Sequence, residues 1–419
     1  MLSPADSDLV KRDNGLPGLA TLLDPAAFAD AWRTQSGNAA VESAALAYLR
    51  YKPGTNCIAA YRIQSARESR CVYAKAFGAD RADKLQKVEG RLHGMACGDL
   101  GIAAFAFPED AKLRTLSRLA VPAQRRALFA RIFDGSEDLR DGALETLAYK
   151  PERRYVARFE AGTGAEAVLK FYAPEGFGAA ASGCKAFESR GVLRIPRKCG
   201  SSKRHRVLAF EWLHGTPLRD VLANPASDVA AVVTVGAAVA ALHAQGNAAL
   251  PRRDAQAEAA KLQQLATTLG FLCPPLASRS AALAARVSSR LASAGSVRCA
   301  IHGDLYDKQV LVGPEWITIL DLDQAALGDP RSDLGLFIAH LERDHLLGRL
   351  DATRVAEAAG ALAQGYQEAA GTPVKGLAAH VADGLLRLAH HPFRSHSPGW
   401  PDDTARILER VEEILEGPQ

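Results

Sequence analysis

Three polar residues in one short stretch have the types and the spacing that phosphoryl transfer requires. Asp304 follows an apolar run, and Gln309 comes five residues later at the start of another. Asp321 stands at the exit of a further short apolar segment, 316–320. Two hairpin-linked strands would hold these three side chains around one small space. A carboxylate there can orient an attacking hydroxyl, and oxygen ligands can hold Mg²⁺ on nucleotide phosphates. We assign Asp304 to the first task, and Gln309 with Asp321 to the second.

The residues around these three extend the pattern into a recognisable motif. The stretch reads His302-Gly303-Asp304, then an amide, then the second aspartate, and it continues with Gly328-Asp329-Pro330 and Asp333-Leu334. This order resembles the aminoglycoside phosphotransferase (APH)-like branch of small-molecule kinases, which have a protein-kinase-like fold. That family usually has Asn at the position of Gln309; Gln keeps the carbonyl oxygen but adds a methylene. The resemblance implies ATP and Mg²⁺ as cofactors and Asp304 as the catalytic residue.

Four polar residues near the motif are interpreted as supports. The resemblance implies that His302 stabilises the catalytic loop by hydrogen bonding and does not act as a base. We expect Asp329 to brace that loop through backbone amides, and Asp333 to be the N-cap of the next helix. His243, near the end of an apolar stretch, is expected to be a hydrogen-bonding histidine of the core.

An internal repeat is the second informative feature. Residues 49–62 and 147–160 share Leu, Tyr, Lys and Pro at equivalent positions, 98 residues apart. Each copy continues through a turn into a strand with a lysine, Lys75 in the first copy and Lys170 in the second. Alternation and turn residues predict strand, basic turn, strand, turn, strand in both copies. This order resembles the first three strands of a kinase small lobe, whose third strand bears the lysine that contacts nucleotide phosphates.

The second copy is the one expected to bind the nucleotide, because the residues after it resemble the rest of a small lobe. We therefore assign Lys170 to the nucleotide phosphates. A helix is expected within 178–190, and Glu188 is the candidate carboxylate to pair with Lys170. Glu175 is expected to lie too close in sequence, in a loop.

The resemblance also implies where the rest of the nucleotide binds. Residues 207–218 resemble the fifth strand and the hinge, so Glu211 and Leu213 are the expected adenine-contacting positions. Arg153 and Arg154 lie in the loop between the first two strands, where charge-assisted hydrogen bonds to phosphate are feasible. A solvated basic turn is the alternative for these two arginines.

These assignments predict an α+β, two-lobed protein-kinase-like fold with a small β-rich lobe, a duplicated β unit and a large, mostly helical lobe. We expect three parts: 1–140, an extra subdomain or cap with the first β unit; 141–215, the nucleotide-binding small lobe and hinge; and 216–419, the helical large lobe. The first β unit has three open interpretations: a decayed duplicate, an extension of the nucleotide-lobe sheet, or a cap over the cleft. Helices are expected at 81–95, 121–133, 229–244, 255–268, 278–293, 333–347, 351–369, 375–390 and 402–416.

Composition indicates a cytoplasmic protein. Of 419 residues, 48% are hydrophobic and 23% are charged, which is ordinary for a soluble globular chain. A net charge of +4 is too small to favour nucleic acid or a membrane surface as a partner. No apolar run reaches the ~20 residues that span a bilayer, and the N-terminus lacks a signal-peptide core. Seven scattered cysteines suggest free thiols in a reducing compartment. We expect a monomer or a homodimer.

The acceptor is expected to be a hydroxyl of a small molecule: a sugar, an amino sugar or an aminoglycoside. The loop 390–400 is rich in His and aromatic residues. Trp400 could stack on a sugar ring and Arg394 could bind a substrate anion, or both could simply pack. Two other classes stay open. A non-catalytic nucleotide-binding regulator is suggested by Gln309 and by the missing glycine-rich loop. A protein kinase is disfavoured because the sequence after Asp304 has no recognisable activation segment bounded by Asp-Phe-Gly and Ala-Pro-Glu.

Overall fold

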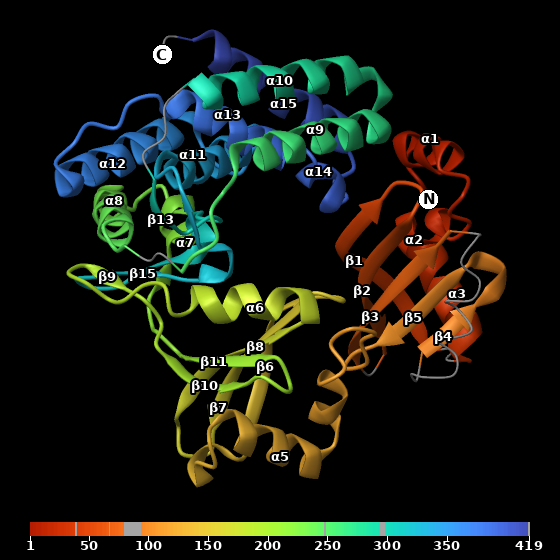
Figure 1. Cartoon of the computed structure of the whole chain (residues 1–419). Coiled ribbons are helices and arrows are strands. Elements are labelled where there is room, and N and C mark those ends of the chain that lie inside the picture. The colour runs from red at the N-terminus through yellow and green to blue at the C-terminus, as the bar shows by residue number, and fades with distance from the viewer. Residues whose placement is uncertain (38–39, 67, 79–93, 247–248, 294–297, 418–419) are drawn as a thin grey trace. The chain divides into compact units, whose positions relative to one another are not determined.

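The chain forms two compact units. The computed structural model describes residues 1–37, 40–66, 68–78, 94–246, 249–293 and 298–417 (Figure 1). Unit 1 comprises Met1–Glu175, Cys199–Ala209 and His391–Pro401. Unit 2 comprises Gly176–Lys198, Phe210–His390 and Asp402–Gln419. Each unit combines segments that are distant in sequence, so the three-part division at 140 and 215 stays a prediction.

Unit 1 begins with three helices and a five-stranded antiparallel sheet. The helices are α1 (Pro4–Arg12), α2 (Leu19–Leu23) and α3 (Pro25–Ser36), and the strands are β1 (Val41–Lys52), β2 (Asn56–Ser65), β3 (Ser69–Phe77), β4 (Gly94–Cys97) and β5 (Ile102–Ala106). Ser3 and Asp24 cap α1 and α3 with their side chains, each before a proline at the first helical position. Phe28 of α3 stacks on Tyr61 of β2 with ring centroids 3.9 Å apart, and both rings are buried. This apolar contact packs α3 against the first sheet.

A second five-stranded sheet completes most of unit 1. It contains β6 (Gly142–Lys150), β7 (Arg154–Ala161), β8 (Glu166–Tyr172), β10 (Lys198–Ser202) and β11 (Val207–Glu211). Helix α5 (Pro122–Ile132) packs against it through Phe129, whose ring lies 5.0 Å from that of Phe159 on β7. The helix expected at 121–133 is thus confirmed. The one expected at 81–95 lies outside the described residues, apart from its last two positions, which belong to β4.

The internal repeat covers both whole sheets. Their strand orders are β1-β2-β3-β5-β4 and β6-β7-β8-β11-β10, which are the same topology. Lys75 of β3 stands opposite Ile58, and Lys170 of β8 stands opposite Val156. Ile58 and Val156 are themselves equivalent positions of the repeat. The two lysines therefore occupy the same site in the two sheets, as the sequence repeat predicted.

Unit 2 is mainly helical. Its longer helices are α8 (Ala230–His243), α9 (Ala255–Leu272), α10 (Ala277–Ser293), α11 (Arg331–Leu346), α12 (Ala352–Ala370), α13 (Leu377–Leu388) and α15 (Trp400–Glu416), the last of which starts in unit 1. These confirm the expected helices from 229 onwards to within a few residues. Their apolar faces form one buried core, which includes Val235, Phe337, Leu362 and Leu385.

Two small sheets of unit 2 carry the motif. One has the order β12-β14-β15-β9, and the other is the antiparallel pair β13-β16. Their strands are β9 (Leu193–Arg194), β12 (Thr216–Pro217), β13 (Cys299–Ile301), β14 (Val310–Val312), β15 (Ile317–Ile319) and β16 (Ala326–Gly328), and the short helix α7 (Leu218–Ala223) follows β12. Buried residues such as Ala300, Val310 and Ile319 fix these short strands to the core of unit 2.

Candidate active site

A β-hairpin places the two expected metal ligands side by side. Gln309 ends a short 3₁₀ turn and leads into β14, which pairs with β15, and Asp321 follows β15 closely. The Leu320 N–H donates to the carbonyl oxygen of Gln309 over 2.8 Å, which locks the two chain segments together. The Gln309 amide Nε2 then donates to Oδ2 of Asp321 over 3.3 Å. The structure therefore brings Gln309 and Asp321 into contact, as the sequence predicted.

The backbone of Asp321 lies in the left-handed region, with φ +62° and ψ +59°. A non-glycine residue adopts this conformation at an energetic cost, and such residues concentrate at functional sites. The neighbouring contacts hold Asp321 there against its intrinsic preference.

A buried carboxylate braces the catalytic loop. Asp333, which is 1% exposed, accepts hydrogen bonds from the backbone N–H groups of His302, over 2.7 Å, and Gly303, over 2.8 Å. Its Oδ2 also lies 3.0 Å from Nε2 of His243, whose Nδ1 contacts the Tyr366 hydroxyl at 3.0 Å. Burial alone would raise the pKa of Asp333, but the hydrogen bond and the positive potential from His243 outweigh it and lower the pKa below its usual value. His243 is a core histidine, as expected.

The roles expected of Asp329 and Asp333 are corrected by these contacts. Asp333 braces the loop and lies inside the first turn of α11, so it is not the N-cap. Asp329 accepts from the backbone N–H of Arg331 at 2.9 Å and forms an ion pair with its guanidinium at 2.6 Å. Asp329 is thus the residue that stabilises the helix start. The sequence could not distinguish their roles, because Asp329 lies just before α11 and Asp333 lies in its first turn. Only the packing shows which carboxylate faces the loop around Asp304.

His302 uses both ring nitrogens to shape the loop around Asp304. Its Nε2 donates to the Leu320 carbonyl oxygen over 2.7 Å, while its Nδ1 accepts from the Asp304 N–H over 3.2 Å. The expected supporting role fits this geometry. Asp304 itself is exposed, where a substrate hydroxyl can reach it.

Gly303 allows the close approach of a second segment. Its φ is +85°, and a Cβ there would lie 2.2 Å from the carbonyl oxygen of Gln324. Arg253, which sequence reasoning missed, donates to the Gly303 carbonyl oxygen over 2.5 Å. No local pattern around Arg253 could have signalled this contact, because 50 residues separate the partners.

The pair of Gln309 and Asp321 fits one side of a nucleotide-bound Mg²⁺. Among the described residues, no group of three or more His, Cys, Asp or Glu side chains could hold a metal ion alone. Mg²⁺ commonly takes one or two protein oxygens and completes its shell with phosphates and water. To serve as a ligand, the Gln309 amide must present Oε1 where Nε2 now donates to Asp321.

Comparisons with known proteins identify the family to which the chain belongs. The profile of the phosphotransferase enzyme family (APH) matches residues 150–406, which is more than half of the chain. The chain belongs to this family. A comparison with curated proteins finds no significant sequence match. Among solved structures, choline kinase from Cryptosporidium parvum Iowa II is similar with a TM-score of 0.53 at 8% identity, over 71% of this chain and 95% of that one.

Two further solved structures are similar at lower scores. A choline/ethanolamine kinase family protein from Mesorhizobium loti has 18% identity and a TM-score of 0.48, over 71% of this chain and 95% of that one. A thermostable mutant of aminoglycoside phosphotransferase APH(4)-Ia, in a ternary complex with ADP and hygromycin B, has 18% identity and a TM-score of 0.49, over 71% and 98%. Family membership confirms the predicted two-lobed, protein-kinase-like fold.

The phosphate-binding candidates of this family member lie in unit 1. Lys170 is half-buried on β8, next to Val156 of β7. Arg153 is exposed in the turn between β6 and β7, and Arg154 is the first residue of β7. Lys170 and Arg154 thus lie on adjacent strands of one sheet, and Arg153 lies in the turn before β7; their contacts with phosphate stay predictions.

Glu188 does not lie in a helix. Helix α6 spans Pro174–Gly183 and ends before it, so the expected helix within 178–190 is wrong in its position. Glu188 is an exposed loop residue whose N–H donates to the side chain of Gln245 over 2.9 Å. Glu175, expected in a loop, is in the first turn of α6 and pairs with Lys112 at 2.6 Å. Pro174 is the first residue of α6, a position that proline favours, so the helix starts earlier than expected.

The expected hinge lies at the end of the second sheet. Glu211 is the last residue of β11, and its carboxylate accepts from the Arg197 N–H over 2.8 Å. Leu213 follows in the segment between β11 and β12, and it is half-buried. The side chain of Glu211 thus forms a hydrogen bond within the protein. The predicted contact with adenine concerns the backbone of Glu211.

Trp400 is not a surface for sugars. It is 2% exposed, its Nε1 donates to the Asp6 carboxylate over 3.1 Å, and its ring lies 5.1 Å from that of Phe393. The alternative of simple packing is therefore correct for this residue. Arg394, in the short helix α14 (His391–Arg394), stays an untested candidate. Across the described part of the chain, no helix has the length and apolarity needed to cross a membrane.

Proposed function

We propose that this protein transfers the γ-phosphoryl group of ATP to a hydroxyl of a small molecule, such as a sugar, an amino sugar or an aminoglycoside. One observation carries the proposal: Asp304 stands on a loop that a buried histidine–aspartate network braces, and His302 of that loop is hydrogen-bonded to the residue before Asp321, which contacts Gln309. Membership of the phosphotransferase enzyme family supports the reaction class.

The residues divide the work as follows. Asp304 orients the acceptor hydroxyl and accepts its proton, which leaves late in a loose transition state. Gln309 and Asp321 would hold Mg²⁺, which neutralises charge on the nucleotide phosphates. Lys170 anchors the phosphates, and the backbone near Glu211 and Leu213 binds adenine.

Phosphoryl transfer requires the loop around Asp304 to be held in a fixed position, and several buried contacts hold it. In-line transfer depends on holding two reactants in a near-attack geometry, and small displacements are costly. Asp333 fixes the two residues immediately before Asp304 through their N–H groups. His302 connects the same loop to the residue immediately before Asp321. The base and the metal-binding carboxylate therefore share one rigid support within unit 2.

A panel assay tests the proposal. Purified protein is given Mg-ATP or Mg-GTP with sugars, amino sugars and aminoglycosides, and nucleoside diphosphate release and phosphorylated product are measured. Asp304→Asn should lower turnover by about 10²–10⁴-fold, the usual contribution of a general base, while nucleotide affinity is retained. Glu315→Gln, at an exposed position between β14 and β15, is the matched control. Undiminished phosphorylation by Asp304→Asn would refute the assignment.

One observation favours a second candidate, a nucleotide-binding regulator without catalysis. The Gln309 amide nitrogen, and not its oxygen, faces Asp321. In that case the protein binds Mg-nucleotide but releases no product with any acceptor. Asp304→Asn then alters neither nucleotide affinity nor product release.

A further inference from the structure

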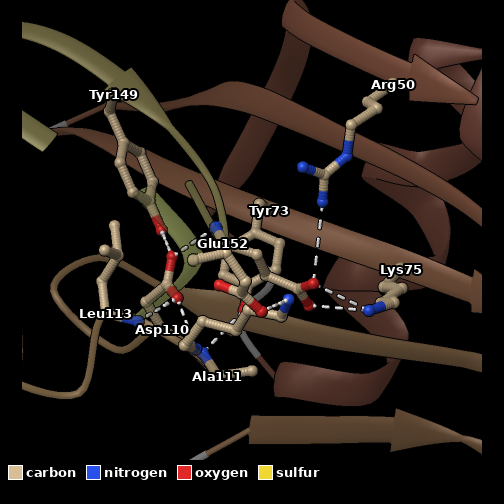
Figure 2. Close-up of polar contacts among 10 residues, drawn as sticks. Arg50, Tyr73, Lys75, Asp110, Ala111, Leu113, Tyr149 and Glu152 are labelled. Atoms are coloured by element: carbon tan, nitrogen blue, oxygen red, sulfur yellow. Dashed lines mark hydrogen bonds and ion pairs between the residues drawn. The ribbon is translucent and has the colours of Figure 1, made fainter. Parts of the chain in front are cut away.

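The first sheet of unit 1 has its own lysine at the position equivalent to Lys170, and that lysine is already paired. Nζ of Lys75 lies 2.8 and 3.0 Å from the two carboxylate oxygens of Glu152. Arg50 of β1 lies in the same row of the sheet, since both residues stand opposite Ile58, and its Nη2 is 3.7 Å from the same carboxylate. Figure 2 shows both basic side chains converging on Glu152. Two cations of the first sheet thus hold one anion from the second β unit.

Glu152 occupies a position where the backbone favours glycine. The turn 150–153 joins β6 to β7, with the Arg153 N–H donating to the Lys150 carbonyl oxygen over 3.0 Å. Pro151 is its second residue, and Glu152, the third, has φ +57°. The equivalent turn of the first copy, 52–55, has the same hydrogen bond and has Gly54 at this place, with φ +61°. A turn with proline second and positive φ third ordinarily takes glycine there, so Glu152 is strained.

The carboxylate of Glu152 is not needed to form this turn. In the first copy, Asp13 accepts from the Tyr51 hydroxyl and from the Gly54 N–H, the latter over 2.9 Å. In the second copy, Asp110 accepts from the Tyr149 hydroxyl over 2.8 Å and from the Glu152 N–H over 2.9 Å. The same aspartate arrangement therefore holds both turns, and the glycine version forms without an ion pair. The Glu152 side chain is an addition to a turn that is already held.

That addition is buried as well as strained. The Glu152 side chain is 3% exposed, and Lys75 is 18% exposed. A buried carboxylate that loses its partner is strongly destabilising, so Glu152 depends on Lys75 and Arg50. The first turn, by contrast, exposes Gly54. A residue that is both strained and buried in an ion pair points to a function for the contact itself.

We propose that the Glu152–Lys75 ion pair positions the nucleotide-binding turn. It fixes the turn 150–153, which carries Arg153 and leads into Arg154, to the first sheet. Asp110 already maintains the shape of this turn, and the ion pair fixes where the turn lies against the first sheet before the nucleotide binds. Glu152 and Lys75 are positioning residues that act through Arg153 and Arg154. The first sheet therefore contributes to nucleotide binding without contacting the nucleotide itself. This inference rests on the proposed function, because it assigns the turn to nucleotide phosphates.

The expected effect follows from the population of the competent turn. An apparent dissociation constant equals the intrinsic value divided by the competent fraction, so a turn that is competent about one tenth of the time binds about tenfold more weakly. Breaking the ion pair should therefore weaken Mg-nucleotide binding and raise KM for ATP, whereas kcat and KM for the acceptor change little.

The test uses the full chain and a non-hydrolysable ATP analogue with Mg²⁺, with affinity measured by calorimetry and stability by thermal unfolding. Lys75→Met and Glu152→Gln should bind the analogue about tenfold more weakly. Lys75→Arg, which keeps the positive charge, should bind it with near wild-type affinity. The matched control is Lys112→Met, which removes an exposed ion pair with Glu175 in the same part of the chain.

Glu152→Gly separates positioning from a merely structural role. It relieves the backbone strain and recreates the turn of the first copy, so its unfolding temperature should equal or exceed that of the wild type. Its nucleotide affinity should nonetheless fall like that of Lys75→Met. Unchanged affinity in Glu152→Gly and Lys75→Met overturns the ion-pair proposal and leaves the proposed function standing. Failure of the wild type to bind the analogue overturns both.

Discussion

Replacement of Asp333 by Asn should destabilise unit 2 by about 3–5 kcal/mol at neutral pH, and the contacts of the carboxylate give this magnitude. The best placement of the amide keeps its oxygen toward His302 and His243 and turns its NH₂ group toward the Gly303 N–H. That leaves the partly buried N–H of Gly303 unsatisfied, which costs about 1–3 kcal/mol. Two charge-assisted bonds also become neutral, at about 1 kcal/mol each. The total is a large part of a typical stability of about 5–15 kcal/mol.

The pH dependence gives the prediction a second, independent part. The pKa of Asp333 is lowered in the folded protein, so its stabilising effect is present above the unfolded value and is lost as pH falls through the folded value. The difference between wild type and Asp333→Asn should therefore be largest above about pH 5 and should shrink below about pH 4.

Urea unfolding at several pH values, followed by helical circular dichroism and by tryptophan fluorescence, measures both parts. Asp402→Asn, at an exposed position of α15, is the control and should stay within about 0.5 kcal/mol of wild type. A loss below about 1 kcal/mol at pH 7 would contradict the calculation from unsatisfied donors. A loss that is equally large at pH 3 would show that the charge of Asp333 is not what stabilises the loop.

Three further predictions concern other parts of the chain. Gln309→Ala should raise the Mg²⁺ concentration for half-maximal activity at least about tenfold, and an unchanged Mg²⁺ titration would remove Gln309 from the metal site. Gly303→Ala should destabilise by about 1–3 kcal/mol, because of its positive φ and the nearby Gln324 carbonyl oxygen; chemical denaturation at constant pH measures this. Trp400→Ala should cost about 3–5 kcal/mol as a buried aromatic, and a change in unfolding temperature no larger than that of a surface substitution would place Trp400 outside the core.

The sequence predicted the elements of the fold well, for local reasons. Apolar periodicity placed the helices of unit 2, since each helix buries one face in a common core. The Tyr-Lys-Pro repeat predicted the same order of strands and turns in both copies, each with a lysine on its third strand, because β-strand register follows from turn position. That the first copy forms a sheet of its own was one of several open interpretations, and the structure shows it. The helix expected within 178–190 is misplaced, because α6 begins at Pro174 and ends at Gly183, before Glu188.

The candidate site could be predicted only in part. Asp304, Gln309 and Asp321 were identified because their spacing along a hairpin is short, so a local pattern brings them together. The partner of a buried side chain is a different matter, since it depends on which distant element packs against it. The roles predicted for Asp329 and Asp333 are therefore wrong: Asp333 braces the loop, and Asp329 stabilises the start of the helix.

The phosphotransferase motif and the repeated strand unit can be recognised in the sequence alone, because both consist of particular residue types at short spacings. Tertiary structure decided the long-range pairings: Trp400 with Asp6, His243 with Asp333, and Glu152 with Lys75 across 77 residues. The physical reason is that a buried charge or N–H must find a partner, and packing alone determines which candidates are within reach. The strained turn at Glu152 is the clearest case, since its backbone conformation favours glycine and the basic residues of the first sheet explain the carboxylate.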